Sequence, residues 1–252
     1  MNSTHKFNGL AEVYAAGRPA YPDSFIEELY SQHGFSRESV IADVASGTGK
    51  FARLLLERGS FVYCVEPNDD MRARAAEELS GYRGARIING TDARTSLYDH
   101  SVDFVTVAQA FHWFDPVLFR KECARILKNS GQVFLIWNLR DMQSGLNQHS
   151  FRIFTKYCPD FKGFAGGIQQ DDIRIRQFFE GEYTYKEFNH PLVYTSKEAF
   201  INRSLSGSYS LQEGDPGYSQ YLEELSNLFD QYAVDETLTV PNKMIVYFGI
   251  LF

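Results

Sequence analysis

A short loop with two glycines carries residues that could bind a ligand. It runs Asp43-Val44-Ala45-Ser46-Gly47-Thr48-Gly49-Lys50, between a predicted strand and a predicted helix. Glycine lets the backbone turn tightly and approach a ligand without an intervening Cβ, and the helix that follows offers free N–H groups. Glu66 lies 17 residues after Gly49, where its carboxylate can accept two hydrogen bonds from a ribose diol. The spacing therefore predicts a ligand that contains a nucleoside.

Alternating strand and helix patterns place these residues at one edge of a sheet. Apolar stretches predict strands over residues 39–45, 61–65, 86–89, 102–108 and 132–137. Helical patterns lie between them, and Asp115-Pro116 is typical of a helix start because it joins a capping residue to proline at the first position. This order predicts an α/β fold with a mostly parallel sheet and helices on both faces. In such sheets, ligands bind at the carboxyl ends of the strands.

Two classes of cofactor fit the glycine loop taken by itself. Residues 47–52 satisfy the loose form of the dinucleotide fingerprint, which would indicate an NAD(P)-dependent oxidoreductase. A lone match of that kind is weak evidence. It also leaves Asp92 and the segment around His112 without a role, so the oxidoreductase is the less favoured alternative.

The stretch from Val40 to Lys128 resembles the class I S-adenosylmethionine-dependent methyltransferases. The loop falls on that family's first motif, and Glu66 falls on its ribose-binding acid. Residues 90–93 (Gly-Thr-Asp-Ala) resemble its adenine-recognition turn, and residues 108–115 resemble its fourth motif. The His-Trp-Phe-Asp run in the latter is typical of a subgroup that includes trans-aconitate methyltransferases. The resemblance implies a Rossmann-like seven-stranded sheet with one antiparallel strand near the C-terminus, and S-adenosylmethionine as cofactor.

The resemblance also implies which residues hold the cofactor. Gly47 and Gly49 would lie against its methionine portion, and Asp92 would accept a hydrogen bond from the adenine amino group. Ala45 departs from the family pattern, since the family has glycine there and a methyl group reduces the clearance. The full expected cofactor set is Asp43, Ala45, Gly47, Gly49, Glu66, Pro67, Asn68, Met71, Asp92, Ala93, Gln109, Tyr14 and Arg18.

The acceptor side is predicted around His112, which follows the fourth strand. Its imidazole could take a proton from a phenol, hydroxyl or amine, or it could only shape the pocket wall. A carboxylate acceptor is already ionised at neutral pH and needs no base. Arginines could anchor such an acidic acceptor. The expected substrate residues are His112, Trp113, Asn138, Arg140, Arg203 and Tyr209.

The domain organisation expected is a single methyltransferase domain over residues 1–252. Residues 1–35 are expected to form a lid segment, with Tyr14 and Arg18 against the cofactor, and residues 36–138 the cofactor-binding core. Residues 139–165 and 196–235 are expected to form helical cap insertions. The aromatic side chains after Asn138 favour an enclosed pocket for a small molecule over an open groove for a macromolecule, although a well-packed cap core or a dimer face would explain them equally well.

Composition narrows the classes of partner. The chain has 252 residues and a net charge of −7, so its surface does not attract phosphate backbones, and nucleic-acid binding or RNA methylation is disfavoured. The longest apolar run, at residues 244–252, is too short to span a bilayer. We expect a small-molecule substrate, no nucleic-acid or membrane partner, and a monomer or homodimer. A protein methyltransferase and a non-catalytic cofactor-binding protein are the remaining alternatives.

Cysteine and histidine usage points to the compartment and to the absence of a metal. The three cysteines, at 64, 123 and 158, form neither a disulfide framework nor a zinc pattern, and the N-terminus lacks the apolar stretch of a signal peptide. These features favour a reducing cytoplasmic location. The six histidines show no metal-ligand spacing, so no metal is expected.

Overall fold

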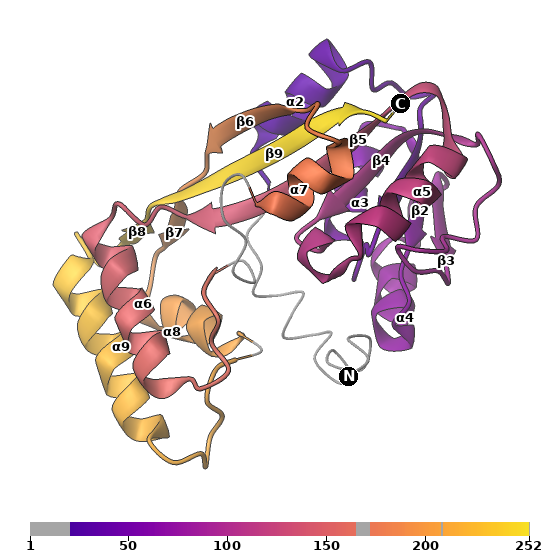
Figure 1. The fold of residues 1–252 in the computed structure, drawn as a ribbon. Coiled ribbons are helices and arrows are strands. Elements are labelled where there is room, and N and C mark those ends of the chain that lie inside the picture. The colour runs from indigo at the N-terminus through magenta and orange to yellow at the C-terminus, as the bar shows by residue number, and fades with distance from the viewer. Residues whose placement is uncertain (1–20, 165–171, 208, 252) are drawn as a thin grey trace.

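A seven-stranded sheet forms the centre of the protein (Figure 1). The computed structural model describes residues 21–164, 172–207 and 209–251. Expected contacts of Tyr14 and Arg18 lie outside the described residues. The strands of the large sheet are β1 (Val40–Val44), β2 (Phe61–Val65), β3 (Ala85–Ile88), β4 (Val102–Ala108), β5 (Leu127–Arg140), β6 (Thr184–Asn189) and β9 (Asn242–Ile250). Their order across the sheet is β3-β2-β1-β4-β5-β9-β6.

Strand direction agrees with the predicted fold class. Strands β3, β2, β1, β4 and β5 are parallel, whereas β9 runs antiparallel to both of its neighbours, β5 and β6. The prediction of a mostly parallel seven-stranded sheet with one antiparallel strand near the C-terminus is therefore confirmed. Because β1 to β4 are parallel, the residues that follow each of them emerge at the same edge of the sheet.

Helices cover both faces of the sheet. On one face lie α2 (Asp23–Gln32) and α3 (Lys50–Glu57), whose buried apolar residues share a cluster with Ile41 and Phe134. On the other lie α5 (Pro116–Ile126) and α7 (Ile173–Phe179), which pack against strand residues such as Val105 and Leu135. Helix α4 (Asp69–Glu78) follows β2. Alternate residues of each strand thus face two cores, as side-chain alternation along a strand requires.

A third apolar cluster lies beyond the end of β5 and the start of β9, in a lobe that we call the cap (Figure 1). The cap consists of α6 (Gly145–Tyr157), α8 (Lys197–Leu205), α9 (Tyr218–Tyr232) and a small antiparallel pair, β7 (Leu192–Tyr194) with β8 (Leu238–Val240). Its cluster of buried residues includes Phe154, Phe200, Tyr221 and Leu228. The cap therefore has its own core, separate from the two cores of the sheet.

The structure differs from the sequence patterns in the length of one strand and in two short strands that were not predicted. The sequence predicts a strand over residues 132–137, but β5 runs from Leu127 to Arg140 and so reaches the cap. The strands β7 and β8 have three residues each and were not predicted, because so short a stretch shows no measurable period.

Candidate active site

The glycine loop after β1 adopts a backbone conformation that only part of its sequence favours. Ala45, Gly47 and Gly49 all have positive φ, at 55°, 58° and 81°. A Cβ on Gly47 would meet nothing within 4 Å, so the space above this residue is open to a ligand. A Cβ on Gly49 would lie 2.6 Å from Cδ1 of Leu79, so packing also demands glycine here. Ala45 tolerates a left-handed conformation at a cost that glycine would not incur.

Glu66, at the end of β2, is joined directly to this loop. Its Oε2 accepts a hydrogen bond from the Gly47 backbone N–H at 2.9 Å, and its Oε1 accepts one from the Asn68 N–H at 2.9 Å. Burial raises the pKa of Glu66, while these two N–H groups oppose that shift. The carboxylate is 7% exposed, so it is fixed in direction but still reaches the surface of the site.

The segment after Glu66 is ordered by the start of α4. Asn68 caps this helix, since its Oδ1 accepts a 3.0 Å hydrogen bond from the N–H of Met71. Asn68 and Met71 are buried, whereas Pro67, which lies between Glu66 and Asn68, is half-buried. Arg72, one turn into the helix, donates from Nη1 to the Glu66 carbonyl oxygen at 2.9 Å. The cap and this arginine therefore fix the backbone on both sides of Pro67.

Asp43 is the most deeply buried acid of the site, at 1% exposure. Its Oδ1 accepts a 2.9 Å hydrogen bond from the hydroxyl of Thr106, while its Oδ2 has no hydrogen-bond partner among the described residues. Burial raises the pKa of Asp43 to about 7; Thr106 opposes this shift and the nearby Glu66 adds to it. A buried carboxylate oxygen of this kind is suited to receive a cationic ligand group.

Asp92 lies in a tight turn after β3. The turn closes through a hydrogen bond from the Thr91 N–H to the Arg94 carbonyl, at 2.9 Å. Burial raises the pKa of Asp92, and the backbone N–H groups of Asp92, Ala93 and Asp115 lower it. Asp115 is the N-cap of α5, so the turn with Asp92 and Ala93 lies against the start of that helix.

The segment after β4 begins with a second non-glycine residue at positive φ. Gln109 has φ of 64°, and its N–H donates to the Ile136 carbonyl at 2.8 Å. A short 3-10 helix, η2 (Phe111–Trp113), follows. His112 is half-buried and Trp113 is 50% exposed, with their ring centroids 4.8 Å apart. These rings lie at the same sheet edge as the glycine loop.

The end of β5 brings a cation toward the cap. Arg140 donates from Nη1 to Oδ1 of Asn147 at 3.2 Å, and its guanidinium lies 4.8 Å from the centroid of the Phe164 ring. Asn138, two residues earlier on β5, is half-buried. Asn138 and Arg140 therefore lie between the sheet edge and the cap.

Two predicted substrate residues, Arg203 and Tyr209, belong to the cap itself. Arg203 donates from Nη1 to the Ser206 hydroxyl at 2.9 Å, at the C-terminal end of α8. The ring of Tyr209 packs against Phe154 and Phe161, at centroid distances of 5.5 Å and 4.8 Å. These contacts give Tyr209 a role in the cap core.

Sequence reasoning missed two residues that support the site. Thr106 pairs with Asp43 across β1 and β4, and its signal is a polar side chain within the apolar stretch of residues 104–108. Arg174, on α7, donates from Nη1 to the His112 carbonyl at 3.0 Å, and Asp172 holds its guanidinium through two oxygens. Because 62 residues separate Arg174 from His112, no local pattern could have shown this contact.

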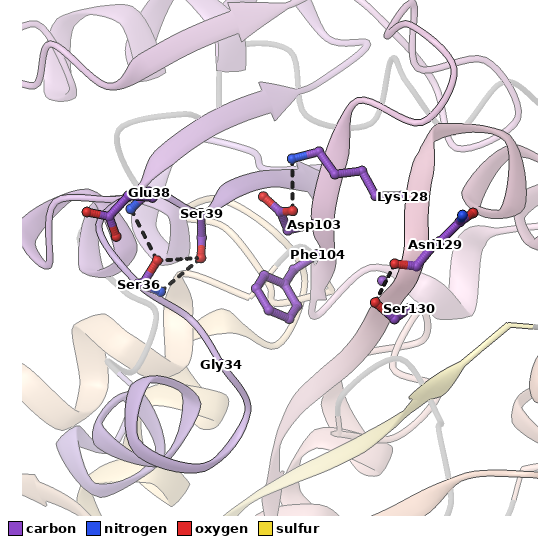
Figure 2. Close-up of a pocket in the computed structure, with 10 residues that line it drawn as sticks. Gly34, Ser36, Glu38, Ser39, Asp103, Phe104, Lys128, Asn129 and Ser130 are labelled. Carbon is purple, nitrogen blue, oxygen red and sulfur yellow. Dashed lines mark hydrogen bonds and ion pairs between the residues drawn. The ribbon is translucent and has the colours of Figure 1, made fainter.

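A surface hollow of about 340 Å³ lies at the opposite edge of the sheet (Figure 2). Ser36, Ser39, Asp103 and Lys128 line it, near the amino ends of β1, β4 and β5. Its polar groups pair with one another: Lys128 contacts Asp103 at 2.8 Å, and the Ser36 N–H donates to the Ser39 hydroxyl at 2.8 Å. The hollow contains none of the predicted site residues, so we place the functional site at the carboxyl edge.

Within residues 21–164, 172–207 and 209–251, no group of three or more His, Cys, Asp or Glu side chains is arranged to hold a metal ion. No helix in these ranges has the length and apolar character needed to cross a membrane.

Part of the chain, which includes the glycine loop, is similar to known methyltransferases. Residues 42–135 match the family described as "Methyltransferase domain". An uncharacterised methyltransferase of Mycobacterium tuberculosis is 36% identical over 143 residues, which cover 55% of this chain and 54% of the relative. The chain thus spans about half the length of the first curated relatives that it matches.

Solved structures support the same fold. The YcgJ protein of Bacillus subtilis has a TM-score of 0.59 at 16% identity, covering 91% of this chain and 99% of its own. Geranyl diphosphate C-methyltransferase of Streptomyces coelicolor, solved with S-adenosyl-L-homocysteine, has a TM-score of 0.50 at 14% identity, covering 90% of this chain and 78% of its own.

The residues at the carboxyl edge of the sheet fit S-adenosylmethionine as the cofactor. Gly47 leaves open space, Glu66 presents a fixed carboxylate, and Asp43 has a buried oxygen without a hydrogen-bond partner among the described residues. Such groups suit the amino acid and ribose portions of this cofactor. Residues 42–135 thus match the methyltransferase-domain family, and the groups at this edge of the sheet suit S-adenosylmethionine as the cofactor.

Proposed function

We propose that the protein transfers a methyl group from S-adenosylmethionine to a small organic acceptor, with a carboxylic acid as the favoured class, and releases S-adenosylhomocysteine. The observation that carries the proposal is the hydrogen bond of 2.9 Å between the Gly47 N–H and Glu66 Oε2. It fixes a carboxylate beside the open space of the glycine loop, at the carboxyl ends of two parallel strands. When bound, the cofactor supplies an electrophilic methyl group on its sulfonium.

The cofactor residues divide by the portion that they would hold. Asp43 would receive the amino group of the methionine portion, and Glu66 would accept hydrogen bonds from the ribose hydroxyls. Asn68 and Met71 would pack beside the adenine, with Asp92 and Ala93 pairing to its edge. Gln109 would line the face where the methyl group is transferred. The proposal retains a lid in which Tyr14 and Arg18 contact the cofactor, but the expected boundary of residues 1–35 is too long, because Asp23–Gln32 form α2 and pack on one face of the sheet.

The acceptor class rests on the charges near the cap. Arg140 lies at the end of β5, and Arg203 lies at the end of α8. A guanidinium can bind a carboxylate through two parallel hydrogen bonds. Asn138 and Tyr209 would add polar and aromatic surface to the same pocket. Because a carboxylate is ionised at neutral pH, this acceptor needs no proton removed, and His112 with Trp113 would shape the pocket wall.

We further propose that the protein acts in a reducing cytoplasm, as a monomer or homodimer. In support, Cys64, Cys123 and Cys158 are all free thiols and all buried. The trans-aconitate methyltransferase subgroup remains the proposed relative within the family, on the strength of the His-Trp-Phe-Asp run at residues 112–115.

Calorimetric titration with S-adenosylhomocysteine tests the cofactor site. We expect heat of binding for the wild type and a loss of affinity of about tenfold or more for Glu66→Gln, because a charged acceptor of two hydrogen bonds is lost. Glu223→Gln, at an exposed position of α9, is the matched control and should bind like the wild type. Absence of heat with the wild type would contradict the proposal.

A thermal-shift screen in the presence of S-adenosylhomocysteine tests the acceptor. Carboxylic acids, phenols and amines are compared, and acids are expected to raise the melting temperature most. Hits are then incubated with S-adenosylmethionine carrying a labelled methyl group. Stabilisation by amines or phenols alone would reject the carboxylic acid, and stabilisation by NADH in place of S-adenosylhomocysteine would favour the oxidoreductase.

A further inference from the structure

A buried acid on α5, outside the motifs considered so far, holds the turn that carries Asp92. Glu122 is 7% exposed and lies in the middle of α5. Its Oε1 accepts two hydrogen bonds from Thr95, one from the backbone N–H at 2.7 Å and one from the hydroxyl at 2.6 Å. Thr95 is fully buried and comes three residues after Asp92. Glu122 therefore fixes the backbone at Thr95, immediately after the turn at residues 90–93 that is predicted to bind adenine.

Arg125 binds Glu122 and also contacts two further residues of the same loop. It holds both oxygens of Glu122, with Nη2 at 2.6 Å from Oε1 and Nε at 2.9 Å from Oε2. Its Nη1 also donates to the Leu97 carbonyl at 2.8 Å and to Asp99 Oδ1 at 2.6 Å. Burial acts to raise the pKa of Glu122, but Arg125 and Thr95 outweigh it and leave the pKa lowered. Glu122 is thus an ionised, fully paired acid.

The two ends of this turn, at residues 89–90 and 95–96, are in close contact with each other. A Cβ on Gly90 would lie 2.6 Å from the Thr95 carbonyl oxygen, so the two ends of the turn touch. Ser96 has φ of 65°, and its hydroxyl donates to the Asn89 carbonyl at 3.2 Å. A displacement of Thr95 would therefore move the whole turn, including Asp92.

Helix α5 contacts this turn at a second point and also carries the acceptor segment. Burial raises the pKa of Asp92; the N–H of the N-cap residue Asp115 opposes that rise, whereas the charge of the Asp115 carboxylate adds to it, so both groups lie near Asp92. Asp115 also ends the His112-Trp113-Phe114 run. One rigid helix thus contacts the turn at Asp115 and at Glu122, two turns of helix apart.

We infer that Glu122 is a positioning residue, which acts through Thr95 to hold Asp92 at the 6-amino group of adenine and so sets the nucleobase selectivity of the site. This inference rests on the proposed function, because it assigns the adenine to the Asp92 turn. Glu122 itself would not contact the cofactor. Glu122 would affect only the binding of the nucleobase, and the proposed hydrogen bonds between Glu66 and the ribose would not depend on Glu122.

The test compares S-adenosylhomocysteine with its 6-oxo analogue, in which hypoxanthine replaces adenine, so that the 6-amino donor becomes an acceptor and N1 carries a hydrogen. The wild type should prefer the adenine ligand by about tenfold or more, the worth of one hydrogen bond to a charged group. Thr95→Val and Glu122→Gln should reduce that preference severalfold, and Thr95→Ser, which keeps the hydroxyl, should retain it. Glu223→Gln should behave like the wild type.

The ratio of the two dissociation constants separates the outcomes. If Thr95→Val and Glu122→Gln weaken both ligands equally and leave the ratio unchanged, their role is only structural and the inference is overturned. If the wild type binds neither ligand, the proposed function fails before the inference is reached. Melting temperatures measured on the same samples show that each variant is folded.

Discussion

Thr106 and Asp43 face each other across neighbouring strands, and the Thr106 hydroxyl donates a 2.9 Å hydrogen bond to Asp43 Oδ1. This hydrogen bond satisfies only half of a carboxylate that is 1% exposed. Its other oxygen lacks a hydrogen-bond partner among residues 21–164, 172–207 and 209–251. The pair therefore keeps a buried, proton-sensitive group at the end of β1, and the protein's stability should depend on its titration.

Asp43→Asn should flatten the dependence of stability on pH. Folding raises the pKa of Asp43 from 3.8 to about 7, so between these values the folded protein holds a proton that the unfolded chain has released. The free energy of unfolding contributed by this group therefore falls as pH rises through that window and is constant above it. Urea unfolding at several pH values, for wild type and variant, gives the difference. Parallel curves for the two proteins would contradict the assignment.

Ala45→Gly should stabilise the protein. Ala45 has φ of 55°, a conformation that costs a non-glycine residue about 1–2 kcal/mol. Glycine removes that strain, although it increases the entropy of the unfolded chain, so we expect a net gain of about 1 kcal/mol at most. Ala75→Gly, within α4, is the matched control and should lower stability. Thermal unfolding measures both, and a lower melting temperature for Ala45→Gly would be the opposite result.

Gly49→Ala should destabilise the protein more than Gly34→Ala. Both glycines have positive φ, at 81° and 78°, so the backbone strain of alanine is similar. Only at Gly49 would the new Cβ collide, since it would lie 2.6 Å from Leu79 Cδ1, while nothing lies within 4 Å of a Cβ on Gly34. The excess should be about 1–3 kcal/mol, typical of overpacking. Chemical denaturation of the two variants, and of Gly49→Ala with Leu79→Ala, tests the steric part; equal losses would exclude it.

His112→Ala should separate the two roles considered for this residue. With a carboxylic acid as acceptor, turnover at saturating cofactor should stay within about threefold of wild type and show no new pH dependence, because no proton is removed. With a phenol or amine acceptor, loss of a general base should cost about 10²–10⁴-fold. Initial rates across a pH series distinguish these cases. A large loss with a carboxylic acid would show that His112 does more than shape the wall.

The sheet could be predicted from the sequence because each strand signals its own position. The apolar run at 102–108 and the Asp115-Pro116 helix start both correspond to β4 and α5 in the structure. Contacts between distant segments could not be predicted. The register that places Thr106 beside Asp43, and the approach of Arg174 to the His112 carbonyl, both depend on how separate elements pack. The three-residue strands β7 and β8 carry too little pattern to be recognised.

Glycine positions illustrate the same limit within the site. The sequence predicts that Gly47 and Gly49 both approach a ligand. In the structure a Cβ on Gly47 would meet nothing within 4 Å, whereas one on Gly49 would meet Leu79. The two residues thus look equivalent in the motif, but the second is also required by the packing of a side chain 30 positions later.

The separate core of the cap has an evolutionary consequence. Its buried residues pack among α6, α8, α9, β7 and β8, apart from both cores of the sheet. Substitutions in one core should then be nearly additive with those in the others, because they share few partners. The cap can therefore change in sequence with little effect on the packing of the two cores that lie against the sheet.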